Sequence, residues 1–443
     1  MRFEKDRLGY AFEDDYPESY GPQDRARLRA IVARQTDQLG QTDRAADDRL
    51  LGILIGRRCG DQKRAQLEQR VRRDGTPSLV ARGEIVLPAE TYPSVKDLLA
   101  EYTMDPGTSG SHVRLRRPSS CASDVDRVVD ACAAAKVEAW PNYVATMAAV
   151  GKGIGGPESA PPPPTVGADP VPAPSGNPVK VAVIDTGIAD QPRGDGMLDG
   201  VLLTAANVDR LDMLPAGPDG LLDYGAGHGT FVSGIIARVA PQAEIRVYRA
   251  ADTDGFATDN DVADAILRAH DDGAQIINLS LGIRTMDDQP PPAIAAAVAA
   301  VRAQSGGRTV IVAAAGNYGD RSTVYPAALP GVEAVAGLTA YLTPAPWSNY
   351  GDVQFSTVAE GIRSTYVEGT ESPVFDPAPD EFPADAWAVW SGTSFAAPQI
   401  AGAVARISYE EGIDVRAAVE KLADYGKEIV GFGKAMRILQ GIG

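Results

Sequence analysis

The chain has 443 residues, more than a single domain usually contains, so we expect two domains. Apolar residues make up 44% and charged residues 23%, which excludes a wholly disordered chain. The net charge of −17 falls entirely on residues 151–443, because residues 1–150 carry equal numbers of acidic and basic side chains. Such a surface repels nucleic acid and anionic lipid, so neither is expected as a partner.

The composition also predicts a cytoplasmic location. No run of about 18 apolar residues is present, which excludes a transmembrane helix. The first twenty residues are acidic and lack the apolar core of a secretory signal. The three cysteines, Cys59, Cys121 and Cys132, cannot all pair with one another. An odd, sparse set of thiols is typical of a reducing compartment.

The first third of the chain divides into two parts. Residues 1–75 form a charged region in which two or three amphipathic helices are expected, because apolar residues recur there at helical spacing. In residues 76–150 expected strands and helices alternate, which predicts a small α+β module. Its expected strands lie at 84–88, 112–116 and 137–144, and its expected helices at 95–102 and 124–136.

A proline-rich linker, residues 151–178, is expected next. Residues 155–178 contain nine prolines and no apolar periodicity, which is typical of an extended, polyproline-like tether. Residues 179–443 then alternate between short apolar runs and helical segments. The runs lie at 179–184, 245–248, 276–279, 310–313 and 332–336, and the helices at 231–237, 261–272, 292–305, 395–411 and 415–425. This alternation predicts an α/β domain with a mostly parallel sheet and helices on both faces.

Three short segments of this domain each place one polar side chain at the end of a predicted sheet element, where active sites of open α/β sheets lie. They are VAVIDTGI with Asp185, GAGHGTFVSG with His228 and SGTSFAAPQIAG with Ser394. A serine nucleophile needs a base, and the base needs a carboxylate to hold its tautomer. Singly, the segments could be a strand-end turn, a helix-start loop and an N-cap. Together, in this order, they favour a nucleophilic site.

With these segments the chain resembles the subtilisin-like serine proteases, over roughly residues 179–437. The segments INLSLG, VAAAGN, VYPAALPGVEAV and WSNYG extend the likeness, and the order Asp, His, Ser is that of the family. The resemblance implies that Asp185 orients His228, that His228 acts as general base and then acid, and that Ser394 attacks the carbonyl carbon. Asn317 would donate its side-chain amide to the oxyanion, beside the backbone N–H of Ser394.

The resemblance also implies how a peptide would bind. Ser280, Leu281 and Gly282 would pair with the peptide as an added strand. Gly282, with Ala314 and Gly316, would wall the pocket for the residue before the cleaved bond. These residues are small and uncharged, which predicts an apolar or large side chain in that pocket. The alternative is that they serve only close packing.

No metal and no cofactor are expected, although calcium remains possible. Many family members carry a long calcium-binding loop after the helix that bears the histidine. Residues 234–241 of this chain continue without an insertion of that kind. Asp252, Asp254, Asp259 and Asp261 are crowded, but their spacing does not match an EF-hand loop. We expect them to form a solvated loop beside the cleft.

The sequence therefore predicts a serine endopeptidase that acts on a protein or peptide substrate. The alternatives are a catalytically silent subtilase-fold module that binds proteins, and a hydrolase with one dedicated substrate, such as a peptide-maturation protease. Residues 84–147 resemble the α+β inhibitory prodomain of the family, whose C-terminal tail lies in the cleft. This resemblance implies a zymogen in which the tail, near residues 145–150, enters the cleft of its own catalytic domain. An independent domain tied on by the linker is the other interpretation.

Overall fold

The computed structural model describes residues 22–40, 44–59, 64–105, 111–117, 125–147, 156–162, 177–376 and 378–442. We call residues 22–147 the N-terminal part and residues 177–442 the C-terminal part. No helix within these described ranges is long and apolar enough to cross a membrane.

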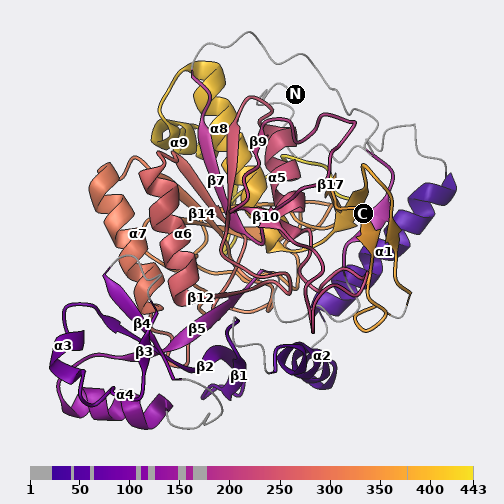
Figure 1. Cartoon of the computed structure of the whole chain (residues 1–443). Coiled ribbons are helices and arrows are strands. Elements are labelled where there is room, and N and C mark those ends of the chain that lie inside the picture. The colour runs from indigo at the N-terminus through magenta and orange to yellow at the C-terminus, as the bar shows by residue number, and fades with distance from the viewer. Residues whose placement is uncertain are drawn as a thin grey trace.

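The C-terminal part is built on a nine-stranded sheet (Figure 1). Its strands are β7 (Lys180–Asp185), β9 (Val201–Leu202), β11 (Glu244–Arg249), β13 (Ile276–Leu279), β14 (Val310–Ala314), β15 (Val332–Leu338), β16 (Phe355–Val358), β21 (Lys427–Ile429) and β22 (Gly433–Met436). The order across the sheet is β21-β22-β16-β15-β14-β13-β7-β11-β9. Every neighbouring pair is parallel except β21 with β22. The four strands that the sequence did not indicate lie at the two edges of this sheet.

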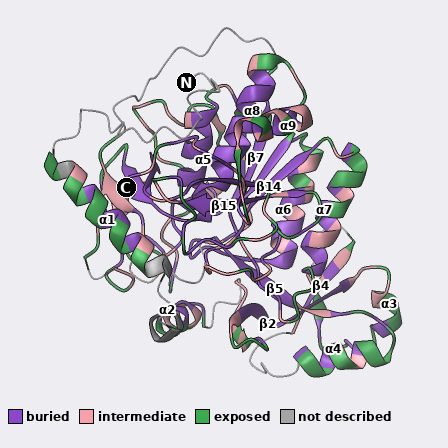
Figure 2. Ribbon diagram, turned by 180° about the vertical axis from the view of Figure 1, so that it is seen from behind, coloured by how far each residue is buried: buried purple, intermediate pink, exposed green. Residues whose placement is uncertain are grey.

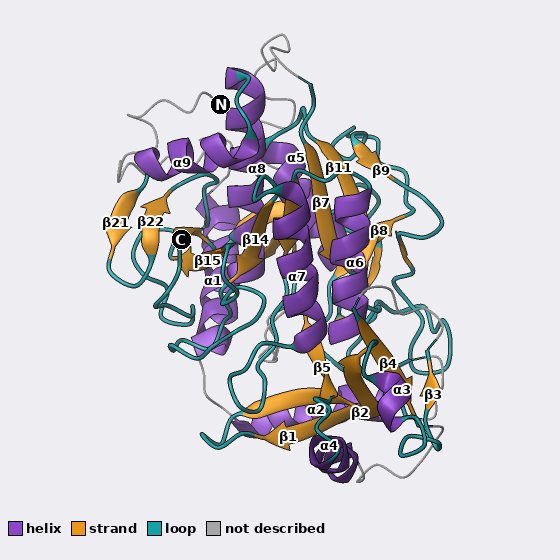
Figure 3. Ribbon diagram, turned by 90° about the vertical axis from the view of Figure 1, so that its left-hand side faces the viewer, coloured by secondary structure: helices purple, strands orange, loops and turns teal. Residues whose placement is uncertain are grey.

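Helices cover both faces of this sheet (Figure 3). One face carries α5 (His228–Val239), α8 (Ala397–Glu411) and α9 (Val415–Tyr425), and the other carries α6 (Asp259–Asp271) and α7 (Pro292–Ser305). In β7, Val181 and Val183 pack with α5 and α8, whereas Ala182 and Ile184 pack with α6 and α7. Successive side chains of a strand point to opposite faces, so a strand buried on both faces is an unbroken apolar run. The buried residues accordingly fill the middle of the molecule (Figure 2).

The N-terminal part contains a second, antiparallel sheet. Its own strands are β1 (Leu67–Val71), β2 (Pro77–Pro88), β3 (Thr103–Met104), β4 (His112–Arg116) and β5 (Trp140–Thr146). The helices α3 (Tyr92–Val95) and α4 (Val125–Ala134) pack on it through an apolar cluster that contains Ile85, Leu87 and Cys132. The sheet begins at Leu67, earlier than residue 76, and the helix expected at 95–102 is confined to Tyr92–Val95.

Two further helices precede that sheet. In α1 (Pro22–Gly40), Leu28, Ile31 and Val32 pack against Val389 and Ile442 of the C-terminal part. The helix lies beside the C-terminus of the chain (Figure 1). In α2 (Arg44–Arg57), the leucines join an apolar cluster that reaches both β1 and Phe256 of the C-terminal part. The apolar faces expected from the sequence therefore have partners in both parts.

The proline-rich linker differs from a bare polyproline tether. Its residues Glu158–Ala160 form strand β6, which pairs antiparallel with β20 (Trp387–Trp390). β20 pairs in turn with β17 (Ile362–Thr365). Residues 158–160 lie between two prolines and keep their backbone N–H groups, so they can join a ladder that proline cannot. Most of the remaining linker lies outside the described residues.

The expectation of a solvated loop at the aspartate cluster is wrong, because Asp254 and Asp259 are buried. Asp259 accepts hydrogen bonds from the backbone N–H groups of Ala293 (3.0 Å) and Ile294 (2.8 Å), in the first turn of α7. Burial raises the pKa of Asp259 to about 7 and that of Asp254 to about 6. The partners that bury these carboxylates come from distant segments, so the local sequence does not reveal them.

The raised pKa of Asp259 makes stability depend on pH. A carboxyl whose folded-state pKa exceeds its unfolded value of 3.8 stabilises the fold fully below about pH 4. That contribution is lost as the pH rises through about 7, at up to about 1.4 kcal/mol per pH unit. Asp259→Asn should reduce this slope, most clearly between about pH 6 and 7, above the pKa of Asp254. Urea unfolding at several pH values between 4 and 8, in a Ser394→Ala background, measures it. Asp271→Asn on the exposed end of α6 is the control, and an unchanged slope in Asp259→Asn would refute the assignment.

Candidate active site

Asp185 and His228 meet at the carboxyl end of the central strand. Asp185 is the last residue of β7, His228 is the first residue of α5, and both are buried. His228 Nδ1 lies 2.7 Å from Asp185 Oδ1, which also accepts a hydrogen bond from the backbone N–H of Thr186 at 2.8 Å. The carboxylate is therefore placed to hold the proton of the imidazole on Nδ1.

The backbone around His228 depends on two glycines. Gly227 has a φ of 76°, in the left-handed region that favours glycine. At Gly229, an added Cβ would lie 2.1 Å from the carbonyl oxygen of Gly187, so a side chain there would clash with the backbone. These glycines allow the start of α5 to pack directly on the turn that follows β7.

A buried carboxylate that the sequence analysis missed, Asp209, supports the same turn. Its Oδ2 accepts hydrogen bonds from Thr186 Oγ1 (2.9 Å) and from the backbone N–H of Gly227 (2.9 Å). Thr186 Oγ1 in turn accepts the backbone N–H of Gly229 at 3.1 Å. Burial raises the pKa of Asp209 to about 6. Only its position in the fold marks Asp209, because nothing in the local segment distinguishes it from a turn residue.

Ser394 lies in a 3₁₀ turn, Thr393–Phe395, just before α8. Its Oγ lies 2.7 Å from the carbonyl oxygen of Met147 and 3.2 Å from that of Ser280. His228 Nε2 is buried and has no hydrogen-bond partner among the described residues. A hydroxyl has one proton to donate, and in this structure it faces the carbonyl of Met147 rather than His228. The structure thus brings Asp185 and His228 into contact, while Ser394 contacts the tail of the N-terminal part.

Asn317 stands beside the nucleophile with its amide oxygen already used. Its Oδ1 accepts hydrogen bonds from the backbone N–H of Thr393 (2.9 Å) and from Thr393 Oγ1 (2.7 Å). This orientation turns the amide N–H₂ group away from Thr393. Asn317, Met147 and Ser394 line the same narrow pocket. The side-chain amide is therefore available to an oxygen that becomes negative during attack by Ser394.

Asn317→Ala should lower turnover about 10²–10³-fold with little change in KM, the usual cost of losing one oxyanion donor. Asn317→Asp is the matched variant, because it keeps an acceptor for Thr393, removes the donor and places a negative charge where the oxyanion forms. Steady-state kinetics on a peptide substrate measures both. Full turnover in Asn317→Asp would rule out a role as an oxyanion donor.

The tail of the N-terminal part lies in the cleft as an added strand. Residues 144–146 of β5 pair antiparallel with β12 (Phe256–Thr258). On the other side, Thr146 exchanges two backbone hydrogen bonds of 3.1 Å with Gly282, within the segment expected to pair with a peptide. The backbone N–H of Met147 donates to the carbonyl of Gly255 at 2.9 Å. The tail therefore runs between two segments of the C-terminal part and reaches Ser394 at Met147.

The pocket beside Met147 is narrow. Leu281, Gly282, Ala314 and Gly316 line it, and its volume is about 10 Å³. Val324 limits the space: a Cβ added at Gly282 would lie 2.8 Å from Val324 Cγ1, and one added at Gly316 would lie 3.0 Å from Val324 Cγ2. Thr146 and Met147 of the tail are among the residues that line it, so this volume is the space that remains beside the tail. It does not set the size of the side chain that the pocket accepts.

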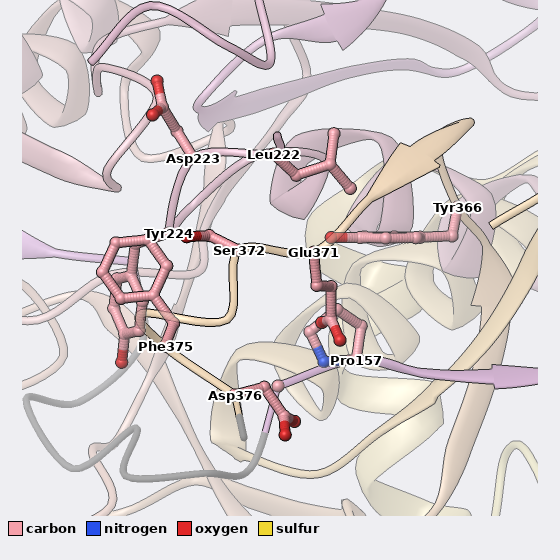
Figure 4. Close-up of a pocket in the computed structure, with 10 residues that line it drawn as sticks. Pro157, Leu222, Asp223, Tyr224, Tyr366, Glu371, Ser372, Phe375 and Asp376 are labelled. Carbon is pink, nitrogen blue, oxygen red and sulfur yellow. The ribbon is translucent and has the colours of Figure 1, made fainter. Parts of the chain in front are cut away.

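A second small pocket, of about 40 Å³, lies where the linker meets the C-terminal part (Figure 4). Gly156 and Pro157 of the linker form one wall, and residues 222–224 and 366–376 form the others. The rings of Tyr224 and Phe375 meet edge to face with centroids 5.2 Å apart. None of its lining residues lines the pocket at Ser394, so it is a packing gap at the linker contact.

The described residues include two free thiols and no cluster of metal-binding side chains. In the part of the chain that the structure describes, no group of three His, Cys, Asp or Glu side chains is placed to hold a metal ion. Cys59 and Cys132 are free thiols, exposed and buried respectively. Cys121 lies outside the described residues.

The C-terminal part is similar in sequence to known proteins. The model of the subtilase family matches residues 176–422. A thermophilic serine proteinase from Bacillus sp. (strain AK1) is 33% identical over 257 residues, which are 55% of this chain and 56% of that protein. Thermitase from Thermoactinomyces vulgaris is 31% identical over 263 residues, 56% of this chain and 82% of thermitase. The chain thus spans just over half the length of the first of these relatives.

Two solved structures align over both parts of the chain. Fervidolysin from Fervidobacterium pennivorans has a TM-score of 0.57 and 20% identity, and the match covers 85% of this chain and 63% of fervidolysin. An epidermin leader peptide-processing serine protease from Staphylococcus aureus has a TM-score of 0.56 and 17% identity, over 81% of this chain and 97% of that one. At these identities the two matches show the fold.

Proposed function

The chain belongs to the subtilase family of serine proteases, and on that premise we propose a serine endopeptidase whose own N-terminal part occupies its cleft. The observation that carries this proposal is the contact of Ser394 Oγ with the carbonyl of Met147, at the end of a strand held by β12 and Gly282. A peptide bound in the same way would present its carbonyl to the nucleophile. The tail is therefore a substrate-like strand, and the chain is a zymogen.

Catalysis requires the Ser394 hydroxyl to turn from the tail carbonyl to His228 Nε2. His228 takes the proton as Oγ attacks the carbonyl carbon, and Asp185 holds the Nδ1 proton and stabilises the imidazolium. The amide of Asn317 and the backbone N–H of Ser394 stabilise the oxyanion. His228 then gives the proton to the departing amine, and a water molecule repeats the sequence to release the acyl group.

A catalytically silent binding module is the rival interpretation. Binding alone does not require a buried histidine whose Nδ1 lies 2.7 Å from a carboxylate. The Nε2 atom of this histidine has no hydrogen-bond partner within the described ranges, so it is free to act as a base. A fluorophosphonate probe separates the two. Labelling of the processed wild type that is lost in Ser394→Ala supports the protease, and absence of labelling in both supports the binding module.

Polar contacts and apolar packing support self-binding by the N-terminal part. Ser78 Oγ donates to the carbonyl of Arg284 at 2.7 Å, and Arg58 pairs with Asp252 at 2.6 Å. Arg114 pairs with Asp261 at 3.0 Å. With the cluster around α2 and Phe256, these contacts spread over several elements, which favours a docked inhibitor over an independent domain.

The tail suggests the substrate. Because the carbonyl that faces Ser394 belongs to Met147, whose side chain is buried, we infer that an apolar residue precedes the cleaved bond. A general endopeptidase should digest casein, whereas a protease dedicated to the maturation of one peptide should hydrolyse a small peptide ester and spare casein. The digestion pattern of these two substrates distinguishes the alternatives.

Calcium should matter less here than in relatives that carry the calcium loop. We expect EDTA to lower the melting temperature of the Ser394→Ala chain by less than about 2 °C, which corresponds to at most about 1 kcal/mol for a domain of this size. Differential scanning calorimetry with and without EDTA, followed by calcium add-back, measures the shift. A fall of about 10 °C or more, reversed by calcium, would show a bound ion.

Cytoplasmic location stays a proposal that rests on the two free thiols. Fractionation of producing cells, with a thiol-reactive label on Cys59, tests it. Recovery of the chain outside the cytoplasm would overturn it.

A further inference from the structure

A large basic cavity lies between the two parts, away from Ser394. Its volume is about 820 Å³, within the range of about 300–1,000 Å³ that small-molecule sites occupy. It is lined by two aspartates, Asp252 and Asp261, and by six arginines: Arg58, Arg64, Arg114, Arg116, Arg210 and Arg249. In a chain with a net charge of −17, such an excess of positive charge at one place needs an explanation.

Protein carboxylates balance only some of these arginines. Arg58 pairs with Asp252 at 2.6 Å, and Arg64 lies 3.8 Å from the same carboxylate. Arg114 pairs with Asp261 at 3.0 Å and Arg116 with Glu84 at 2.8 Å. Arg210 and Arg249 make no ion pair with any side chain in the described ranges.

Arg249 is also close to other positive charges. Burial lowers its pKa, and the charges of Arg210 and Arg64 lower it further, whereas the charges of Asp209 and Asp252 raise it. Three guanidinium groups around one cavity repel one another, and a multivalent anion bound between them would offset that repulsion. The guanidinium fork binds phosphate oxygens in pairs, so phosphoryl groups fit this set better than a single carboxylate does.

We propose that this cavity binds an oligophosphate, held by Arg210 and Arg249 of the C-terminal part and by Arg64 of the N-terminal part. Arg249 is the last residue of β11 and pairs in register with Asp185, the last residue of the neighbouring strand β7. Val144 of β5 and the residues of β12 also line it, so the strand that enters the cleft forms one wall.

The arginines come from both parts, so the complete site exists only while the parts are docked. A ligand that binds only the docked state stabilises that state by mass action. The oligophosphate should therefore slow release of the N-terminal part. This consequence rests on the proposed function, whereas binding itself does not.

Isothermal titration of the full-length Ser394→Ala chain with inorganic tripolyphosphate tests the site, in a series of titrations that each hold the ionic strength constant. We expect one saturable site, with an affinity that is lower in the titrations at higher salt. Arg249→Ala and Arg210→Ala should each weaken binding about tenfold, the effect of losing one charge-assisted contact. Arg308→Ala, an exposed arginine outside the cavity, is the matched control and should bind as the parent does. Because Arg210 is itself exposed, its replacement does not endanger folding.

Parallel titrations identify the ligand. Equal affinity for ATP and tripolyphosphate indicates that only the phosphate chain is recognised, and tighter binding of ATP indicates a nucleotide; both support the site. No binding, binding that neither variant weakens, or equally tight binding of citrate would overturn the oligophosphate proposal. In the wild type, tripolyphosphate should slow self-processing, and Arg249→Ala should lose that effect. Binding without any slowing would overturn the coupling alone, because the titration does not depend on catalysis.

Discussion

Ser394→Ala should abolish peptide hydrolysis, and His228→Ala should cost nearly as much. In subtilisin, from which the magnitude is borrowed, either loss lowers turnover about 2 × 10⁶-fold. The two groups act as one unit, because the hydroxyl is a poor nucleophile without its base. The double variant should therefore be no slower than either single variant. Initial rates with a peptide substrate, after the N-terminal part has been removed, measure all three.

His270→Ala provides the control for this series, because His270 lies on α6, away from the site. It should keep wild-type turnover. A double variant far slower than both single variants would show that Ser394 and His228 act independently, which contradicts the mechanism.

Arg57→Ala should loosen the N-terminal part and shorten the lag before activity appears. Arg57, at the end of α2, pairs with Asp223 and lies 3.6 Å from Asp254 Oδ2. The side chains of both aspartates are at most 1% exposed. Removal of one partner from a buried ion pair costs about 3–5 kcal/mol, which would weaken docking by about 10²–10³-fold or more. The lag in hydrolysis of a peptide substrate by freshly purified full-length chain measures the effect.

Arg73→Ala is the matched control, because Arg73 is an exposed arginine in the turn between β1 and β2. It should leave the lag unchanged, and Arg57→Lys should restore part of it by returning a positive charge. If Arg57→Ala shows the wild-type lag, the buried pair does not hold the N-terminal part on the cleft.

Local segments explain what the sequence could predict. Asp185, His228, Ser394 and Asn317 each stand in a short segment whose neighbours already suggest the local geometry: a buried strand, a glycine pair or a helix start. The central strands could be predicted for a similar reason, because burial on both faces leaves an unbroken apolar run such as residues 181–184.

Contacts between distant segments explain what it could not predict. Arg57 meets Asp223 across 166 positions, and no local pattern marks either residue as half of a buried pair. Asp259 looks like a loop residue until α7 brings two backbone N–H groups to it. Val324 stands in the segment VYPAALPGVEAV, which resembles the family. Only its approach to Gly282 shows that its side chain borders the pocket at Ser394.

The intact mass of the purified chain, wild type beside Ser394→Ala, tests most directly whether the cleft closed by the tail belongs to a working protease. We predict that the wild type separates into two fragments with the cut within a few residues of Met147, and that Ser394→Ala remains a single species of 46.5 kDa. Cleavage of Ser394→Ala at the same place, in the absence of another protease, or an active wild type cut only elsewhere, would contradict a substrate-like tail at Ser394.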